Sequence, residues 1–291
     1  MLAAFWTGLA VASTGVVLDV AHHGTVQALE DDANTNESVR RLRVATWNVL
    51  ADEYISDEAY PRVAYELLVP EARRAAICGL VTGLIDRLGL DLICLQEVDD
   101  ALVEALHGIA APRGWQTSWS RIAMGRAGCG AVVCGGWRLA AADRVRVSEG
   151  TLERLTVERG AVSLVIHHAH FHWADDGGQG TLRQARRVVR RADASEGAAV
   201  VLGDLNAGPD SDALAHLVRS GFADAHGDKP GLMTAVFEES GAVRTDYVLG
   251  RGLVLSALET GVSAIDGDRS LPDNSVPSDH VPLAAEILLP P

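Results

Sequence analysis

The pattern of apolar and polar residues becomes regular from about residue 41 onward. Residues 42–48 alternate like a half-buried strand, and residues 71–88 repeat apolar side chains at helical spacing. Beyond them, strands and helices mingle without strict βαβ alternation and without a Gly-rich phosphate loop, which favours an α/β (α+β) fold with mixed sheets over a doubly wound fold. Further strands are predicted over 90–97, 129–134, 152–157, 161–168, 198–202, 245–249 and 283–289, and further helices over 100–108, 181–192 and 211–220.

The first 40 residues differ from the rest. Residues 1–18 carry no charge and resemble the apolar part of a signal peptide or anchor, and residues 28–38 resemble a solvated acidic linker. No basic residue precedes the apolar run, which stops at Asp19 and is marginal beside the ~20 apolar residues that cross a bilayer. We therefore expect an N-terminal segment over 1–40 and one folded domain over 41–291, located in the cytoplasm. Export or anchoring through residues 1–18 is the alternative.

Composition is ordinary for a soluble globular protein, with 48% apolar and 22% charged residues. The net charge of −14 argues against a broad surface that grips nucleic-acid backbone. It does not exclude a nucleotide or a short single strand, because a metal ion can supply positive charge locally. Four cysteines are too few for a disulfide scaffold. Cys94 is expected in the core, and Cys129 and Cys134 lack the second ligand pair of a structural zinc site.

Groups that bind metals or phosphates collect where the apolar runs end. A buried strand holds its terminal residue rigidly, while the loop beyond it stays open to a substrate. Asp and Glu offer the hard oxygen ligands that suit Mg²⁺ or Mn²⁺. The segments are Thr46-Trp47-Asn48, Leu95-Gln96-Glu97, His170-Phe171-His172-Trp173, Gly203-Asp204-Leu205-Asn206, Thr245-Asp246-Tyr247 and the Asp279-His280 turn.

These segments, in this order, resemble the endonuclease/exonuclease/phosphatase superfamily. A closer resemblance, over about residues 43–289, is to the branch with nocturnin, the angel proteins and the poly(A)-removing nucleases of the deadenylase complex. The resemblance implies a four-layer α/β/β/α sandwich of two mixed β-sheets flanked by helices, with a metal site at one sheet edge. The branch-level motifs are Thr46-Trp47-Asn48-Val49-Leu50-Ala51-Asp52-Glu53-Tyr54, Asp91-Leu92-Ile93-Cys94-Leu95-Gln96-Glu97-Val98-Asp99, His170-Phe171-His172-Trp173, Gly203-Asp204-Leu205-Asn206 with Pro209-Asp210-Ser211, and Leu271-Pro272 with Pro277-Ser278-Asp279-His280.

On the metal side, the resemblance implies that Glu97 is the principal ligand, with Asn48 adjacent and Asp279 as a further carboxylate. The expected ion is Mg²⁺, with Mn²⁺ possible. The chain departs from some nuclease branches at Leu50, where those branches have an acid. This departure weakens the case for a second permanent metal at that corner.

On the phosphate side, the resemblance implies in-line attack of water on phosphorus. Asp204 resembles the group that orients or deprotonates the water, and Asn206 resembles a group that fixes the phosphate. His170 and His280 resemble donors to the phosphoryl oxygens, with His280 oriented by Asp246. The sequence leaves open whether Asp204 or His280 is the base.

Several neighbouring residues have both a structural and a functional interpretation. His167 and His168 are expected to pack or to lie at the surface, and Trp47 and Trp173 are expected in the core rather than stacked on a base. For His172, contact with the substrate and support of other site residues are equally favoured interpretations. Arg121 and Arg126 are candidates for phosphate contact, because relatives place a phosphate-contacting side chain there. A basic helix is expected to present a solvated face of arginines, namely Arg183, Arg186, Arg187, Arg190 and Arg191.

The favoured function is a Mg²⁺-dependent phosphoesterase acting on an RNA 3′ end or a nucleotide, as a 3′-exonuclease, a deadenylase or a nucleotide or cyclic-phosphate phosphatase. We expect a monomer that does not bind long duplex nucleic acid and does not bind a membrane. The first alternative is an exported nuclease or a sphingomyelinase-like phosphodiesterase. A catalytically inactive nucleotide-binding module is the alternative outside enzymes, and the intact set of Glu97, Asp204 and His280 argues against it.

Overall fold

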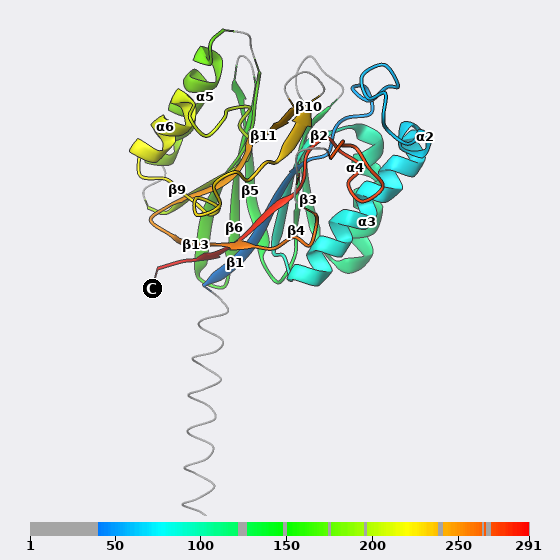
Figure 1. Cartoon of the computed structure of the whole chain (residues 1–291). Helices are drawn as coiled ribbons and strands as arrows, with labels where there is room; N and C mark the ends of the chain where they lie inside the picture. The colour runs from blue at the N-terminus through cyan, green and yellow to red at the C-terminus, as the bar shows by residue number, and fades with distance from the viewer. Residues whose placement is uncertain are drawn as a thin grey trace, which may run out of the picture. The chain divides into compact units, whose positions relative to one another are not determined.

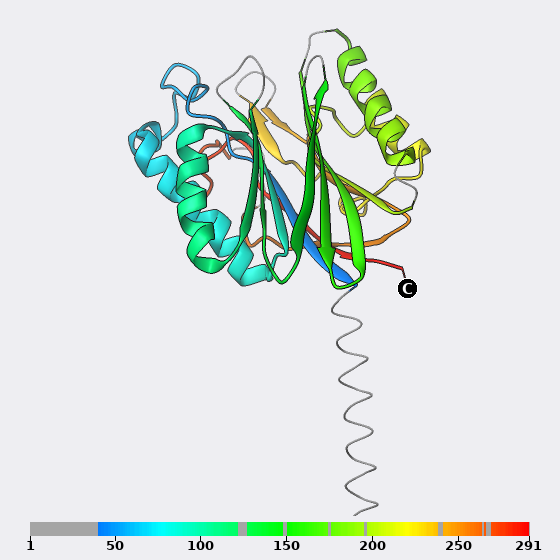
Figure 2. The ribbon, with the colours of Figure 1, turned by 180° about the vertical axis from the view of Figure 1, so that it is seen from behind.

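Two six-stranded mixed sheets lie face to face, and helices cover their outer surfaces (Figures 1 and 2). The computed structural model describes residues 40–121, 127–147, 150–173, 176–194, 197–237, 241–263, 265 and 269–290. The arrangement confirms the predicted four-layer α/β/β/α sandwich. Residues 1–39, which hold the apolar segment and the acidic linker, lie outside the described residues.

The first sheet has the order β13-β14-β1-β2-β4-β3. Strands β1 and β2 are parallel, whereas β2 pairs antiparallel with β4 and β13 pairs antiparallel with β14. Its strands are β1 (Arg41–Asn48), β2 (Leu92–Val98), β3 (Gln116–Arg121), β4 (Gly128–Val133), β13 (Val254–Leu258) and β14 (Leu283–Leu288).

The second sheet has the order β5-β6-β7-β8-β12-β9. Strands β7 and β8 are parallel, and β12 runs antiparallel to β8. Its strands are β5 (Arg138–Val147), β6 (Gly150–Arg159), β7 (Val162–Phe171), β8 (Ala199–Asp204), β9 (Ala223–Asp224) and β12 (Asp246–Arg251), and a separate hairpin joins β10 (Ala235–Phe237) to β11 (Gly241–Val243).

Local sequence signals set the helix ends. Pro70 begins α3 (Pro70–Leu88), where a missing N–H costs nothing, and Gly89 ends it in the left-handed conformation with φ 60°. Asp99 caps α4 (Asp100–Ala110) by accepting from the Leu102 N–H, and Ser211 caps α6 (Asp212–Arg219) in the same way. The other helices are α2 (Tyr65–Leu68), the short 3₁₀ helix η1 (Ala111–Arg113) and α5 (Gln179–Asp193).

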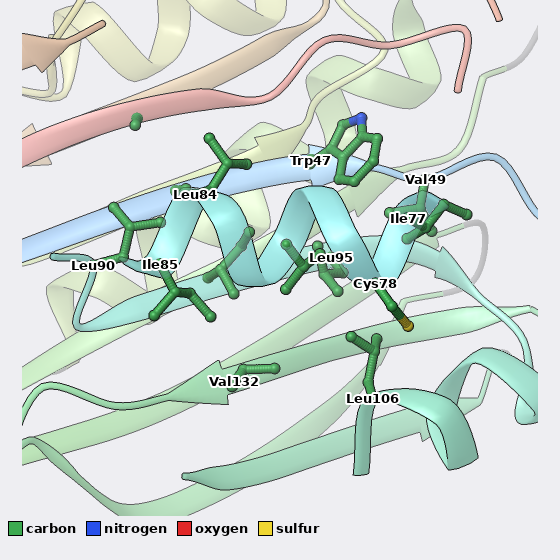
Figure 3. Packing of buried hydrophobic residues seen from close by; sticks show 14 of the residues in the cluster. Trp47, Val49, Ile77, Cys78, Leu84, Ile85, Leu90, Leu95, Leu106 and Val132 are labelled. Carbon is green, nitrogen blue, oxygen red and sulfur yellow. The ribbon is translucent and has the colours of Figure 1, made fainter. Parts of the chain in front are cut away.

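Three apolar clusters separate the four layers. In the outer cluster of the first sheet, Ile77 and Leu84 of α3 pack with Trp47 of β1 and Leu95 of β2 (Figure 3). A second cluster fills the space between the sheets, and a third packs α5 and α6 on the second sheet. Within the described residues, no helix combines the length and the apolar character needed to cross a membrane.

The predicted elements are present with shifted ends, and the missed strands share one property. Strands β3, β5, β9 and β13 were not predicted, and each lies at an edge of its sheet. The two strands of the β10–β11 hairpin, which has no interior strand, and the short helix α2 were not predicted either. An edge strand buries less of its surface, so its sequence shows a weaker apolar pattern. Cys94 is fully buried, as predicted, and the four cysteines are free.

Strands β7 and β8 approach so closely at Gly203 that no side chain fits. Gly203 has φ 138°, and a Cβ there would lie 1.8 Å from the carbonyl oxygen of Ala169. We expect Gly203→Ala to lower the free energy of unfolding by about 3 kcal/mol or more, through backbone strain and overpacking. Gly83→Ala in α3 is the control, because a Cβ there meets no atom within 4 Å. It should raise stability by about 0.5–1 kcal/mol. Urea unfolding measures both variants, and a Gly203→Ala protein as stable as wild type would contradict the predicted close approach.

Candidate active site

The sheet topology brings the predicted polar groups to one edge of the sandwich. Asn48 ends β1, and Glu97 lies near the end of the parallel strand β2. His170 of β7 is paired in register with Asp204, which ends the parallel strand β8. Asp246 begins β12, which runs antiparallel to β8, so it lies opposite Asp204. Strand ends from both sheets therefore meet at the same edge.

Glu97 is held by donors from the end of β1. Asn48 Nδ2 donates to Glu97 Oε1 at 2.9 Å, and the Ala51 N–H donates to Oε2 at 3.1 Å. The amide orientation of Asn48 is fixed, because its Oδ1 accepts from the Leu50 N–H at 3.1 Å. Glu97 has a positive φ of 59° and lies at an irregularity in the pairing of β2 with β4. A positive φ is strained for glutamate, and such strain is common at functional sites.

Asp279 reaches the site on the turn before β14. Tyr60, which the sequence analysis missed, donates its hydroxyl to Asp279 Oδ2 at 2.8 Å. Burial and the charge of Glu97 raise the pKa of Asp279 to about 6, although His280 and Tyr60 oppose the shift. The turn is also fixed to the end of β1, because Ser278 Oγ donates to the carbonyl oxygen of Asn48 at 2.7 Å.

A buried arginine, also missed in the sequence, joins the two loops on this side. Arg73 of α3 donates to the carbonyl oxygens of Val49 at 3.0 Å and Pro277 at 3.3 Å. It also forms an ion pair with Asp52. Its helical segment gave no signal for this role, because the partners are loop atoms far away in the sequence.

Two imidazoles converge on one oxygen of Asp204. His170 Nε2 and His280 Nε2 each lie 3.8 Å from Asp204 Oδ2. Asn48 Nδ2 donates to the same oxygen at 3.2 Å, which links the end of β1 to the end of β8. Burial and the negative charge of Asp246 raise the pKa of Asp204, while the two histidines lower it.

His280 is oriented by a buried carboxylate. Its Nδ1 lies 2.8 Å from Asp246 Oδ2, so Nδ1 carries a proton and Nε2 faces the site. Burial opposes a charge on the ring, but the carboxylates of Asp246, Asp279 and Asp204 outweigh it and raise the pKa of His280 well above its usual value. Phe237 packs edge-on against the ring, with centroids 5.7 Å apart.

The donor set near Glu97 fits a divalent cation. A carboxylate has about four lone-pair positions, and the donors from Asn48 and Ala51 leave positions of Glu97 available. The Glu97 side chain is 15% exposed, so it is not fully closed off from solvent. A second group, Asp204, Asp246 and His280, has ligand atoms within 4.8 Å of one another. There the 2.8 Å contact of Asp246 with His280 is a hydrogen bond that orients the ring, so Glu97 and Asp279 fit the ion better.

The remaining predicted residues lie around this centre. Asn206 follows β8 with φ 45°, and its Nδ2 donates to the carbonyl oxygen of Phe171 at 2.8 Å. The backbone of His172 is held by Gln184 of α5, and its side chain is exposed. The side chain of Arg121 and the whole of Arg126 lie outside the described residues, so their roles stay predictions.

Most of the structural interpretations are confirmed, and the one for Trp173 is wrong. Trp47 is fully buried, and His167 and His168 are buried on opposite faces of β7. Trp173 is 66% exposed, which contradicts the prediction that it lies in the core. It follows β7 by two residues, where the alternation of the strand no longer points side chains inward. In the basic helix α5, Arg183, Arg186 and Arg190 are exposed, as predicted, whereas Arg187 and Arg191 are half-buried.

Comparisons with known proteins agree with this geometry. The sequence profile of the Endonuclease/Exonuclease/phosphatase family matches residues 45–280. No curated protein matches the chain by sequence. A crystal structure of ANGEL2, a 2′,3′-cyclic phosphatase, in complex with adenosine-2′,3′-vanadate is similar at a TM-score of 0.70 and 16% identity, covering 86% of this chain and 96% of that one.

Two further solved structures have the same fold. The human Nocturnin catalytic domain with a bound sulfate anion is similar at a TM-score of 0.63 and 19% identity, covering 85% of this chain and 93% of that one. Truncated TDP2 from Caenorhabditis elegans is similar at a TM-score of 0.59 and 16% identity, covering 85% of this chain and 97% of that one.

Family profile, fold and site together define a metal-dependent hydrolase of phosphoesters. The profile spans most of the sequence, so the chain belongs to the endonuclease/exonuclease/phosphatase family. Its structural neighbours include members of the nocturnin and angel branch that the motifs predicted.

Removal of the Glu97 carboxylate should abolish metal binding. At a free Mn²⁺ or Mg²⁺ concentration about 100 times the dissociation constant, binding to the folded state stabilises it by about 2.7 kcal/mol. For a domain of this size, that raises the melting temperature by roughly 5–10 °C. We expect this increase in wild type and in Glu104→Gln, an exposed residue of α4, and none in Glu97→Gln. Thermal unfolding with and without metal measures the effect. A full increase in Glu97→Gln would show that the ion binds elsewhere.

Proposed function

We propose that the chain hydrolyses a phosphodiester or phosphomonoester at an RNA 3′ end or in a nucleotide, with Mg²⁺ as the metal. The convergence of His170 Nε2 and His280 Nε2 on Asp204 Oδ2, each at 3.8 Å, is the observation that carries the proposal. Two imidazole donors and a carboxylate then surround the position where a phosphoryl group would meet water. Glu97 lies next to this group, with Oε1 3.8 Å from His170 Nε2.

The proposed roles follow from what each side chain can donate or accept. Asp204 takes a proton from the attacking water, because its Oδ2 is the acceptor that faces both imidazoles. The water oxygen forms a bond to phosphorus and the ester P–O bond breaks. The leaving oxygen takes a proton from solvent water, and Asp204 returns its proton to solvent. His170 and His280 donate to the phosphoryl oxygens as negative charge builds there. Asp246 keeps His280 in the orientation that presents Nε2.

On the metal side, Glu97 and Asp279 are the proposed ligands. Asn48 keeps the Glu97 carboxylate in place through the 2.9 Å hydrogen bond, and Tyr60 does the same for Asp279 through the 2.8 Å bond. A divalent cation bound there would neutralise part of the charge on the phosphoryl oxygens. Asn206 is proposed to fix the phosphate from the end of β8, and His172, Arg121 and Arg126 to contact the substrate.

A short substrate fits the charge of the chain better than a long duplex. The net charge of −14 disfavours non-specific attraction of a polyanion. ANGEL2 is described as a 2′,3′-cyclic phosphatase, and a similar TDP2 structure from D. rerio holds a single-strand DNA product. By analogy with these folds, we propose a nucleotide or the end of a single strand as the substrate.

A panel of substrates tests the reaction. The panel is a 3′-tailed RNA, a cyclic-phosphate-ended RNA, NADPH, plasmid DNA and sphingomyelin, each in Mg²⁺ and in EDTA. We expect turnover of one of the first three with Mg²⁺ and none with EDTA. Asp204→Asn should lower kcat by about 10²-fold or more without unfolding the protein. Asp228→Asn, at an exposed carboxylate, should leave the rate unchanged.

The outcomes of this panel separate the alternatives. Turnover of plasmid DNA or sphingomyelin alone would favour the alternative nuclease or phosphodiesterase. An absence of turnover with both Mg²⁺ and Mn²⁺ would refute the proposed reaction. A wild-type rate in Asp204→Asn would refute the role given to that carboxylate.

Asp246 and His280 should act as one unit. We expect Asp246→Asn and His280→Gln each to lower kcat by about 10²-fold or more, since either change removes the oriented Nε2 donor. The double variant should be no slower than the slower single variant, because both changes remove the same function. Single-turnover kinetics on the best substrate measure this cycle. If the fold-decrease in kcat of the double variant equals the product of the two single decreases, the two residues act independently.

A further inference from the structure

A layer of buried polar side chains joins the two sheets next to the active site. We define the polar layer as Gln96 of β2, His168 of β7 and Glu153 of β6, each 1% exposed or less. Gln96 Nε2 lies 2.8 Å from His168 Nε2, and His168 Nδ1 lies 3.1 Å from Glu153 Oε2. Gln96 Nε2 also donates to Thr46 Oγ1 at 3.0 Å. The layer therefore connects β1 and β2 of the first sheet to β6 and β7 of the second.

The polar layer is unfavourable for stability. A carboxylate can only accept, so His168 Nδ1 donates to Glu153, and His168 Nε2 accepts from the Gln96 amide nitrogen that faces it. This assignment leaves Gln96 Oε1 buried and without a hydrogen-bond partner among the described residues. A buried acceptor without a partner and a buried charge both lower stability relative to apolar side chains of similar volume. Stability of the fold therefore does not explain the polar layer.

On β1 and β7, the polar layer and its hydrogen-bond partner Thr46 lie next to the site. Thr46 precedes Asn48 by two residues on β1, and His168 precedes His170 by two residues on β7. Residues two apart on a strand point to the same face, so each of these is adjacent to a site residue. On the far side from the site, the space between the sheets is filled by apolar residues.

Gln96 also sets the start of the strained segment that carries Glu97. Its carbonyl oxygen accepts from the Val49 N–H at 3.0 Å, and its side chain is held by Thr46 and His168. The pairing of β2 with β4 shifts directly after Gln96, and Glu97 adopts φ 59° there. Both the backbone and the side chain of Gln96 are thus fixed immediately before the metal-side carboxylate.

We propose that Gln96, His168 and Glu153 are positioning residues, which fix the sheet spacing at the active-site edge and hold Glu97 in its strained conformation. This positioning role extends the proposed function, and it rests on that function for the assignment of Glu97 as a metal ligand. The site needs groups from both sheets at set distances, as in the 3.2 Å contact of Asn48 Nδ2 with Asp204 Oδ2. Apolar contacts are not directional, whereas hydrogen bonds fix distance and angle. Partners that support metal ligands commonly change metal affinity by about 10–100-fold when removed.

The test replaces the polar layer with apolar side chains of similar size. In the triple variant Gln96→Met, Glu153→Met, His168→Leu, we expect a urea midpoint equal to or above that of wild type. We expect the affinity for Mn²⁺ alone, measured by calorimetry without substrate, to fall about 10-fold or more. Hydrogen exchange of the backbone amides of residues 97–98 and 50–51 should accelerate by about 10-fold or more, and this readout needs neither metal nor substrate.

His167→Leu is the matched control. His167 is the neighbour of His168, is fully buried, and points to the opposite face of β7. Burial, with the charges of Arg154, Arg191 and Arg251, lowers its pKa to about 4, so the ring is neutral at pH 7. Its two ring nitrogens have no hydrogen-bond partner among the described residues. We expect Mn²⁺ affinity and exchange near Glu97 to match wild type in this variant.

Glu153→Gln is the conservative variant, since its side-chain oxygen can still accept from His168 Nδ1. It should keep Mn²⁺ affinity within about 3-fold of wild type, below the range expected for a lost partner. Wild-type affinity and exchange in the triple variant would overturn the proposal. A triple variant that fails to fold, or that unfolds at lower urea, would also overturn it, because the layer would then serve stability. If no substrate reacts, the proposed function is refuted. The hydrogen-exchange and urea results would still test the positioning role, because neither measurement needs a substrate.

Discussion

The side-chain amide of Asn48 links the two sheets at the edge where the chemistry lies. It donates at 2.9 Å to Glu97 of the first sheet and at 3.2 Å to Asp204 of the second. Over most of their contact area the two sheets meet through apolar side chains, which resist separation but resist sliding less. The geometry of the site therefore depends on a few directional contacts between the sheets. The buried contact of Gln96 with His168 is a second one, immediately below the first.

This edge concentrates negative charge in a protein that is already acidic. Asp204, Asp246 and Asp279 are buried, and Glu97 is largely so. Burial and mutual repulsion disfavour their charged forms, and this raises the pKa of Asp204 and of Asp279. His280 provides a compensating positive charge, and a divalent cation at Glu97 would provide another. The arrangement lowers the stability of the fold and favours binding of a cation.

The structural neighbours define the fold more firmly than the substrate. Identities of 13–19% across about 85% of the chain accompany TM-scores of 0.58 to 0.70. The ANGEL2 structure is that of a 2′,3′-cyclic phosphatase, whereas a TDP2 structure holds a single-strand DNA product, and one fold can carry several functions. In this chain, the loops after β1 and β7 carry the exposed aromatic residues Tyr54 and Trp173.

The sequence determined the interior strands, the helices α3, α4, α5 and α6, the family and most of the groups at the site edge. Buried runs ending in polar residues are local signals, and the motifs joined them into one site. The sequence could not predict the edge strands β3, β5, β9 and β13, which bury too little to show a strong pattern. It also missed the contacts of Tyr60 with Asp279 and of Arg73 with Val49 and Pro277, which join residues far apart in the chain. Trp173 was misassigned because alternation ends with its strand, whereas the tertiary structure decides what covers a loop.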